Sequence, residues 1–186
     1  MGLAGSIDVA SPTLEVIKKR LAKADAGQTW RDVFAKVVAV AVILGLAFTF
    51  LFGFYVVPDN GMDPALKEGD LVLYYRLASD VTSDDVVVYE ADGAEHVGRV
   101  AALPGESVEI RQDGTFLVNG NPQAVEYGRV VTPAEGGVTY PVLMNLSSYF
   151  VLGDNVEYAW DSRTCGAVDR SQVRGKALSI LRLRNV

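Results

Sequence analysis

The feature that most constrains this chain is an apolar run without a charged residue, which extends from Val37 to Val57. The run holds 21 residues, and as an α-helix it would be about 31 Å long, enough to cross a hydrocarbon core of about 30 Å. A buried helix of this length in a soluble domain would be expected to show a polar face. A cleaved signal peptide would have a shorter apolar region close to the N-terminus, whereas 36 residues precede this run. The run therefore predicts an uncleaved transmembrane anchor helix over residues 37–57.

Charges on the two sides of this run predict its orientation. Asp59 and Asp63 follow it, and residues 58–186 carry 11 Lys and Arg against 19 Asp and Glu. The preceding segment is basic, with Lys18, Lys19, Arg20, Lys23, Arg31 and Lys36. By the positive-inside rule, residues 1–36 lie in the cytoplasm and residues 58–186 lie outside. We therefore expect a single-pass protein of the cell membrane with an extracytoplasmic C-terminal domain.

The basic segment 1–36 is expected to be helical. Pro12 suits the first turn of a helix, with Ser11 as its cap. Gly27 is expected to end this helix, and Thr29 to cap the membrane helix that follows.

The composition excludes several functions. Lys plus Arg total 17 against 23 Asp plus Glu, a net charge of −6, which argues against a nucleic-acid partner. Hydrophobic residues make up 49% of the chain, which excludes a disordered protein. Cys165 is the one cysteine, so neither a disulfide within one chain nor a CxxC zinc site can form. We expect neither a metal nor a cofactor.

Residues 58–186 read as short strands separated by Gly, Asp, Asn or Pro, and Asp113-Gly114 between two of them signals a hairpin. This pattern predicts a mainly β, antiparallel domain without a long helix. The expected strands are 71–76, 85–90, 96–103, 107–111, 115–120, 149–154 and 177–184.

Four segments, in order and correctly spaced, resemble type I signal peptidases, which are membrane-anchored serine endopeptidases. Residues 58–66 (PDNGMDPAL) match the family's Pro-Ser-x-Ser-Met-x-Pro-Thr-Leu, and residues 68–73 (EGDLVL) match Gly-Asp-x-Val-x-Val. Residues 98–108 (GRVAALPGESV) match Lys-Arg-Val-Ile-Gly-Leu-Pro-Gly-Asp-x-Val. Residues 153–168 keep the family's spacing between Gly-Asp-Asn and Asp-Ser-Arg, and Val-Asn-Gly recurs at 118–120. Together these motifs span nearly the whole external domain.

The resemblance implies two antiparallel β-sheet units and an apolar peptide-binding groove that faces the membrane surface. It also implies which residues form the framework of the groove. These are Met62, Pro64, Gly69, Asp70, Arg99, Gly153, Asp154, Asn155, Asp161, Ser162 and Arg163. In the family, Asp161 and Arg163 would belong to a charge network that shapes the site. Here we expect them to hold the loop in place.

The chain departs from the family at the four polar catalytic positions. The family uses a serine nucleophile and a lysine base whose pKa is lowered by burial. Gly61 stands at the nucleophile position and Gly98 at the lysine position. Asp59 stands where a serine would help to bind the oxyanion, and Ala159 stands where a serine would orient the lysine. The sequence therefore predicts an inactive member of the family.

Two alternatives would restore a catalytic site. A shifted alignment would need a nearby serine, but none lies between Ser11 and Ser79. A new dyad could combine His96, which shares a strand face with Gly98, and the thiol of Cys165. One histidine and one cysteine in a chain of this length are ordinary background, so we disfavour this reading.

The function expected from the resemblance is the binding or positioning of an exported polypeptide. Binding as an added strand needs no serine or lysine. Inactive homologues of this kind accompany pilus assembly by sortases in Gram-positive bacteria, so a pilin or a sortase is the expected partner. The alternative is a working signal peptidase that cleaves signal peptides through unconventional residues.

Overall fold

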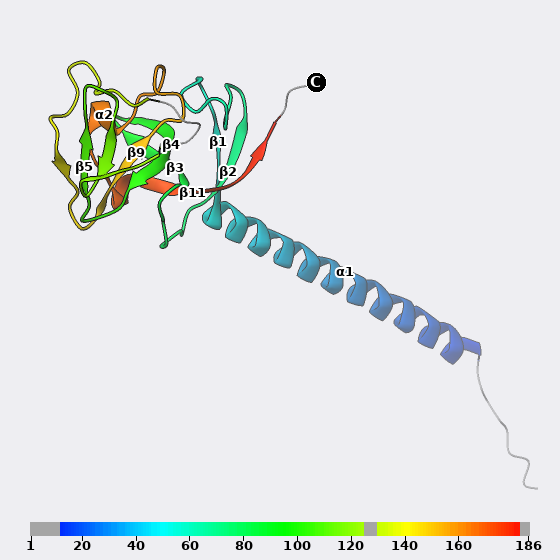
Figure 1. Ribbon diagram of the computed structural model, residues 1–186. Helices are drawn as coiled ribbons and strands as arrows, with labels where there is room; N and C mark the ends of the chain where they lie inside the picture. Colours follow the sequence, from blue (N-terminus) through cyan, green and yellow to red (C-terminus); the bar gives the residue numbers. More distant parts are fainter. Residues whose placement is uncertain (1–11, 125–129, 183–186) are drawn as a thin grey trace, which may run out of the picture. The chain divides into compact units, whose positions relative to one another are not determined.

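The computed structural model describes residues 12–124 and 130–182 (Figure 1). The chain divides into two compact units, Met1–Phe48 and Thr49–Val186. Within the described residues, the first unit is helical and the second holds the strands β1 to β11.

One continuous helix, α1, extends from Pro12 to Leu51. The predicted break at Gly27 is therefore wrong. Glycine inside a helix costs only about 1 kcal/mol relative to alanine, and no proline follows Gly27 until Pro58 to stop the helical hydrogen bonds. Residues 1–11, which include the predicted cap Ser11, lie outside the described residues.

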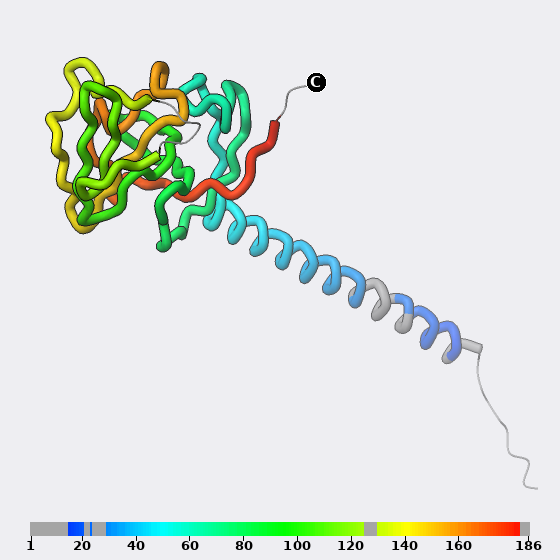
Figure 2. The backbone as a smooth tube through the Cα atoms, viewed as in Figure 1, coloured from blue at the N-terminus to red at the C-terminus, as the bar shows by residue number. Residues whose placement is uncertain are grey.

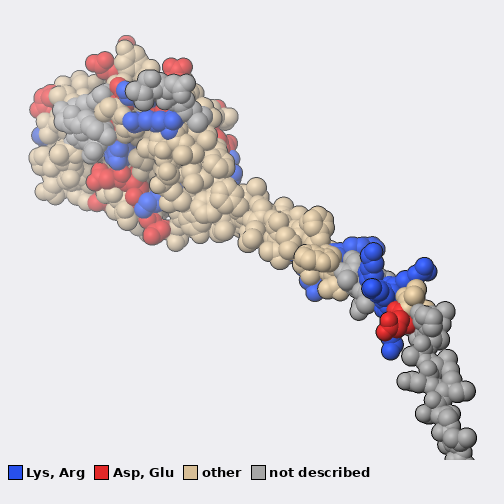
Figure 3. All heavy atoms as spheres, turned by 90° about the vertical axis from the view of Figure 1, so that its right-hand side faces the viewer, with Lys and Arg blue, Asp and Glu red and all other residues tan. Residues whose placement is uncertain are grey.

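The C-terminal part of α1 is long and apolar enough to cross a membrane. This segment, Thr29–Leu51, holds 23 residues, and its most apolar window has a mean hydropathy of 2.4 with none of it buried. Figure 3 shows Lys and Arg side chains gathered on the N-terminal part of the helix, followed by an uncharged stretch. The described part of the chain thus contains one candidate anchor helix near the N-terminus.

Hydropathy predicted a helix as far as Val57, but the apolar run does not remain helical to that residue. The helix ends at Leu51, and residues Phe52–Val56 form strand β1, which pairs antiparallel with β2. Side chains of β1 alternate between buried and exposed, and Tyr55 enters the core. A Cβ on Gly53 would lie 2.3 Å from the ring of Tyr74, so the close approach of these strands requires glycine there. Pairing with a neighbouring strand, which hydropathy does not register, decides the conformation of these residues.

The larger sheet has seven strands in the order β1-β2-β11-β3-β4-β9-β10, and its pairings are antiparallel. The C-terminal strand β11 lies between β2 and β3, as the red segment in Figure 2 shows. The strands beside β1 are β2 (Leu71–Tyr75), β3 (Val86–Ala91), β4 (Ala94–Ala102), β9 (Ser148–Leu152), β10 (Val168–Asp169) and β11 (Val173–Leu181).

The smaller sheet has four strands in the order β7-β6-β5-β8. Its bounds are β5 (Ser107–Ile110), β6 (Phe116–Val118), β7 (Asn121–Pro122) and β8 (Val142–Leu143). The hairpin predicted at Asp113-Gly114 joins β5 to β6, and Gly114 has a φ of 84°, a conformation that favours glycine. Two short helices, α2 (Ser162–Cys165) and η2 (Arg170–Gln172), precede and follow β10.

The predicted mainly β, antiparallel architecture is confirmed. Each expected strand has a counterpart, whereas β1, β7, β8 and β10 were not predicted. The three unpredicted strands other than β1 are two residues long, too short for an alternating pattern to emerge in the sequence.

The position of β1 generates a prediction about where the strand-rich unit begins. We expect a fragment that starts at Thr49 to be more stable than one that starts at Pro58, the boundary inferred from hydropathy. The shorter fragment loses the buried Tyr55 and Val57, and full burial of one such side chain contributes about 1.5–3 kcal/mol. Thermal unfolding of the two fragments measures the difference.

The control for this comparison is Val56→Ser in the longer fragment, because the Val56 side chain is exposed and its loss should change little. Equal melting temperatures for the two fragments would contradict the assignment of β1 to the external domain.

Candidate active-site cleft

Three segments meet at a small hollow where the resemblance expects a catalytic site. The turn after β1 supplies Asp59 and Gly61, strand β4 supplies His96 and Val97, and the loop before α2 supplies Ala159. The remaining walls are the side chains of Tyr55 and Trp160. The structure therefore brings three of the four altered positions to the wall of one hollow, and the fourth, Gly98, follows Val97 on β4.

At the nucleophile position, the backbone amide is already occupied. The Gly61 N–H donates a hydrogen bond of 2.8 Å to Oδ1 of Asp59. The Gly61 carbonyl accepts a hydrogen bond of 2.9 Å from the amide of Asn155, whose own carbonyl accepts from the amide of Ala159. These bonds hold the turn against the loop and place the Asp59 carboxylate on the amide that an oxyanion would need.

At the lysine position, there is no open space for a side chain. A Cβ on Gly98 would lie 2.5 Å from Cγ1 of Val151 and 3.5 Å from Cε1 of Tyr89. Tyr89 is fully buried, and its hydroxyl donates to the Trp160 carbonyl at 3.3 Å. Burial raises the pKa of Tyr89, so this hydroxyl stays protonated and can donate.

Aromatic rings are stacked beside Gly98. The His96 ring lies 4.2 Å from the Trp160 ring at an interplanar angle of 22°, and 5.7 Å from the ring of Tyr89. Burial lowers the pKa of His96, and a hydrogen bond to the Ala91 backbone and the charge of Asp59 oppose this only in part. His96 is therefore held toward its neutral form.

The proposed alternative dyad is not supported by this arrangement. Among the hydrogen bonds of residues 12–124 and 130–182, none joins Cys165 to His96. The Cys165 thiol instead donates to the Gly166 carbonyl at 3.6 Å. Burial, followed by the charge of Asp161, raises the pKa of Cys165 to about 11, so the thiolate is scarce at neutral pH. The pair has neither the contact nor the ionisation that nucleophilic catalysis requires.

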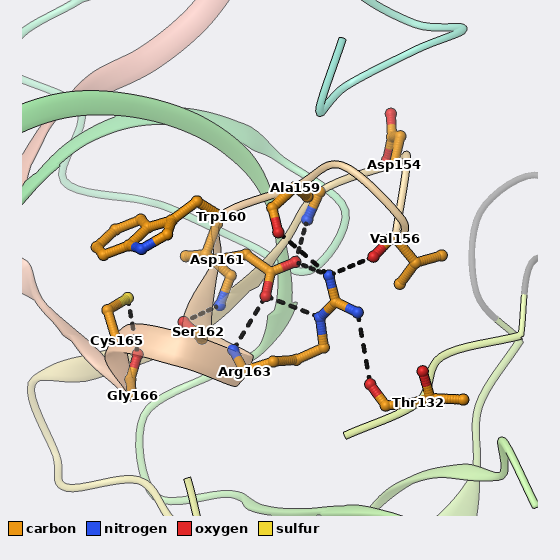
Figure 4. Close-up of polar contacts among 12 residues, drawn as sticks. Thr132, Asp154, Val156, Ala159, Trp160, Asp161, Ser162, Arg163, Cys165 and Gly166 are labelled. Atoms are coloured by element: carbon orange, nitrogen blue, oxygen red, sulfur yellow. Dashed lines mark hydrogen bonds and ion pairs between the residues drawn. The ribbon is translucent and has the colours of Figure 1, made fainter. Parts of the chain in front are cut away.

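The framework residues Asp161 and Arg163 form a buried ion pair below the hollow (Figure 4). Nε of Arg163 donates to Oδ1 of Asp161 at 2.9 Å, and the side chains are 5% and 1% exposed. The guanidinium also donates to the carbonyls of Thr132, Val156 and Ala159.

The Asp161 carboxylate accepts from the Gly153 amide at 3.0 Å and caps α2 by accepting from the Arg163 amide. This single pair ties the loop at 156–161 to β9.

Other framework residues support the same loop. Ser162 Oγ accepts from the Val151 amide at 2.9 Å, and Arg99 donates two hydrogen bonds of 2.8 and 2.7 Å to the carboxylate of Asp154. A Cβ on Gly153 would lie 2.2 Å from the Cβ of Ala159, so only glycine allows the loop to pack this closely.

The turn at 57–70 is fixed at both ends. Met62 is buried, and its sulfur accepts from the Asp154 amide at 3.4 Å. At the far end, Asp70 is buried and accepts from the Lys67 amide at 2.9 Å, and Gly69 has a φ of 83°. Pro64 lies between them and is exposed. These residues shape the turn but do not line the hollow.

Sequence reasoning did not single out Tyr55 and Tyr89. Tyr55 lies in the run that was expected to be helical, yet it is part of strand β1 and its hydroxyl donates to the Glu95 carbonyl at 3.0 Å. Tyr89 lies opposite His96 on the neighbouring strand, and this register is not visible in one sequence. Within the described residues, no group of three or more His, Cys, Asp or Glu side chains is arranged to hold a metal ion.

The buried ion pair generates a stability prediction. Arg163→Ala leaves the Asp161 carboxylate buried without its cation, and breaking a buried pair in this way costs about 3–5 kcal/mol. Arg111→Ala is the matched control because its pair with Glu109 is exposed, and we expect little change there. Chemical denaturation of the two variants measures the difference, and similar midpoints would contradict a supporting role for the buried pair.

Known proteins are similar to this chain in sequence. Residues 30–181 match the family described as signal peptidase, peptidase S26. Signal peptidase I of Bacillus licheniformis is 32% identical over 156 residues, 76% of this chain and 83% of that protein. Signal peptidase IB of Staphylococcus aureus is 33% identical over 160 residues, 75% of this chain and 83% of that protein. The crystal structure of a signal peptidase I from Enterococcus faecalis is 27% identical with a TM-score of 0.43, covering 54% of this chain and 98% of that one. The chain thus belongs to the type I signal peptidase family, as the sequence resemblance predicted.

Proposed function

We propose that this family member binds and positions an exported polypeptide at its cleft without hydrolysing it. The observation that carries the proposal is the hydrogen bond from the Gly61 amide to Asp59, at the position where the family has its nucleophile. Two further residues, Gly98 and Ala159, line up with the lysine base and the serine that orients it.

The chemistry of these residues opposes peptide hydrolysis. A peptide carbonyl must be attacked by a nucleophile, and glycine supplies none at position 61. The negative charge that develops on the carbonyl oxygen would meet the Asp59 carboxylate instead of a free amide. The Cβ of a lysine at position 98 would lie 2.5 Å from Cγ1 of Val151, so it could enter only if Val151 moved.

Peptide binding, in contrast, depends on backbone groups that remain in place. The amide and the carbonyl of one residue in an antiparallel strand point to the same side, and the next residue points to the other side. The backbone groups of Val100 bond to Asp84 and Asp85 on the β3 side. Because the direction alternates from residue to residue along β4, Val97 and Glu95 direct their backbone groups to the other side, away from β3. Strand β9 covers this side of β4 only from Arg99 to Ala102, which leaves Val97 at the hollow. An extended peptide can add to this strand edge.

The charges on the two sides of the membrane segment support an extracytoplasmic location for the cleft. The basic residues precede the apolar part of α1, and the strand-rich unit is acidic. We infer that the N-terminus is cytoplasmic and the cleft extracytoplasmic, where exported polypeptides emerge. A pilin or an assembly sortase is the partner that we propose.

The alternative function is signal-peptide cleavage through residues other than a Ser–Lys dyad. It is favoured by the relatives, which are named signal peptidase I and signal peptidase IB. A cleavage assay separates the two functions, because an enzyme releases its precursor as two products whereas a holding protein retains it intact.

We expect the full-length protein in detergent micelles to leave a signal-bearing precursor uncut between about pH 5 and pH 10, where a histidine or lysine base would titrate. A base gains its active form as the pH rises through its pKa, but at position 61 there is no hydroxyl for it to deprotonate. Mass spectrometry of the precursor measures cleavage, with an active signal peptidase I as positive control. Cleavage that disappears in Cys165→Ala or His96→Ala would overturn the proposal in favour of the new dyad.

A series of restoring substitutions tests how far the site has changed. Gly61→Ser places its Cβ 3.0 Å from Oδ1 of Asp59 and 3.2 Å from Cα of Ala159, contacts that a small local shift relieves, so it should change stability little. Gly98→Lys drives its Cβ toward Val151, and such overpacking costs about 1–3 kcal/mol. We expect the double variant to melt lower than Gly61→Ser alone and to show little cleavage.

Adding Asp59→Ser and Ala159→Ser should then raise cleavage above that of the double variant, because residues of one catalytic unit act non-additively. Robust cleavage by the double variant would contradict the importance of Asp59 and Ala159. An inert quadruple variant that remains folded would contradict the retention of a peptide-binding groove.

A further inference from the structure

We propose that the cleft recognises a lysine side chain of the bound polypeptide, whose ammonium group pairs with the Asp59 carboxylate. This inference rests on the proposed peptide-binding function and goes beyond it by naming the chemical group that the site selects.

The Asp59 carboxylate has binding capacity left at the hollow. Its Oδ1 accepts from the Gly61 amide, whereas Oδ2 has no protein partner among the residues that the structure describes. A carboxylate can accept several hydrogen bonds, and an ammonium group donates three. The bond to Gly61 also fixes the carboxylate in place, which lowers the entropy lost when a cation binds.

The charges around the hollow favour a cation from outside. Asp59 lines the hollow, and burial, followed by the charges of Asp59 and Glu95, raises the pKa of Tyr55 on its wall to about 12. Two nearby arginine side chains already form ion pairs, Arg99 with Asp154 and Arg163 with Asp161. Relative to the family pattern, the site has lost a lysine at position 98 and gained a carboxylate at position 59. An incoming lysine would replace the cation that the chain no longer supplies.

The walls of the hollow suit an ammonium group better than a metal ion. Tyr55, His96 and Trp160 line it, and a cation beside aromatic rings and a carboxylate is stabilised by about 0.5–1 kcal/mol where it is exposed and by more where it is partly desolvated. Divalent metal ions instead require several oxygen ligands, and one carboxylate does not provide them. The compact ammonium of lysine also fits a narrow hollow better than the planar guanidinium of arginine.

Binding of short peptides to the full-length protein in detergent micelles tests this inference. The probe is a fluorescent alanine-rich peptide with blocked ends and one lysine, whose position is varied along the peptide. The matched probe carries acetyl-lysine, which keeps the length and removes the charge. We expect the best lysine peptide to bind about three- to tenfold more tightly than its acetylated partner at low salt, as measured by fluorescence anisotropy.

Asp59→Asn should abolish this preference, because its amide oxygen can still accept from Gly61 but carries no charge to pair with an ammonium group. Asp63→Asn is the matched control, since Asp63 lies on the same turn beside Lys67 and outside the hollow. The control should keep the preference.

Each outcome separates this inference from the proposed function. If both peptides bind equally to the unmodified protein, the cleft binds peptides without selecting a lysine side chain, and only the inference fails. The same holds if the preference persists in Asp59→Asn or if an arginine peptide binds more tightly. If neither peptide binds at any lysine position, the proposed function and the inference both fail.

Discussion

The cleft depends on the buried ion pair between Asp161 and Arg163. The pair is removed from water, so its stability requires every remaining donor and acceptor to find a partner, and backbone groups of the surrounding loop provide them. The loop therefore has one arrangement in which the pair is satisfied. That arrangement brings Ala159 and Trp160 to the hollow. The electrostatics of this pair hold the loop in place without any contribution from the residue at position 61.

Around this framework, the residues at the predicted catalytic positions make contacts with their neighbours. Asp59 accepts from the Gly61 amide, Val151 lies where a Cβ on Gly98 would stand, and the His96 and Trp160 rings stack. These contacts support the proposal that the site holds a polypeptide without hydrolysing it.

Much of this could be predicted from the sequence, and the limits have physical causes. Most of the predicted strands are rich in β-branched or aromatic residues and are bounded by Gly, Asp, Asn or Pro, and the resemblance to signal peptidases predicts the roles of positions 61, 98 and 163. The start of β1 could not be predicted, because residues 52–56 are as apolar as a membrane helix and become a strand only through pairing with β2. The aromatic stack could not be predicted either. It depends on the register of β3 against β4 and on a loop far away in sequence.

The placement of β11 has a consequence for the order of folding. This strand is formed by residues 173–181, near the C-terminus, yet it separates β2 from β3 in the middle of the larger sheet. Strands β1 and β2 can pair early because they are close in sequence, and so can β3 and β4, but the two pairs cannot join through β11 until residues 173–181 are available. Contacts between such distant segments form slowly. A chain truncated before residue 173 would therefore leave the β1-β2 pair separated from the β3-β4-β9-β10 sheet, each with an exposed edge, a form prone to aggregation and proteolysis.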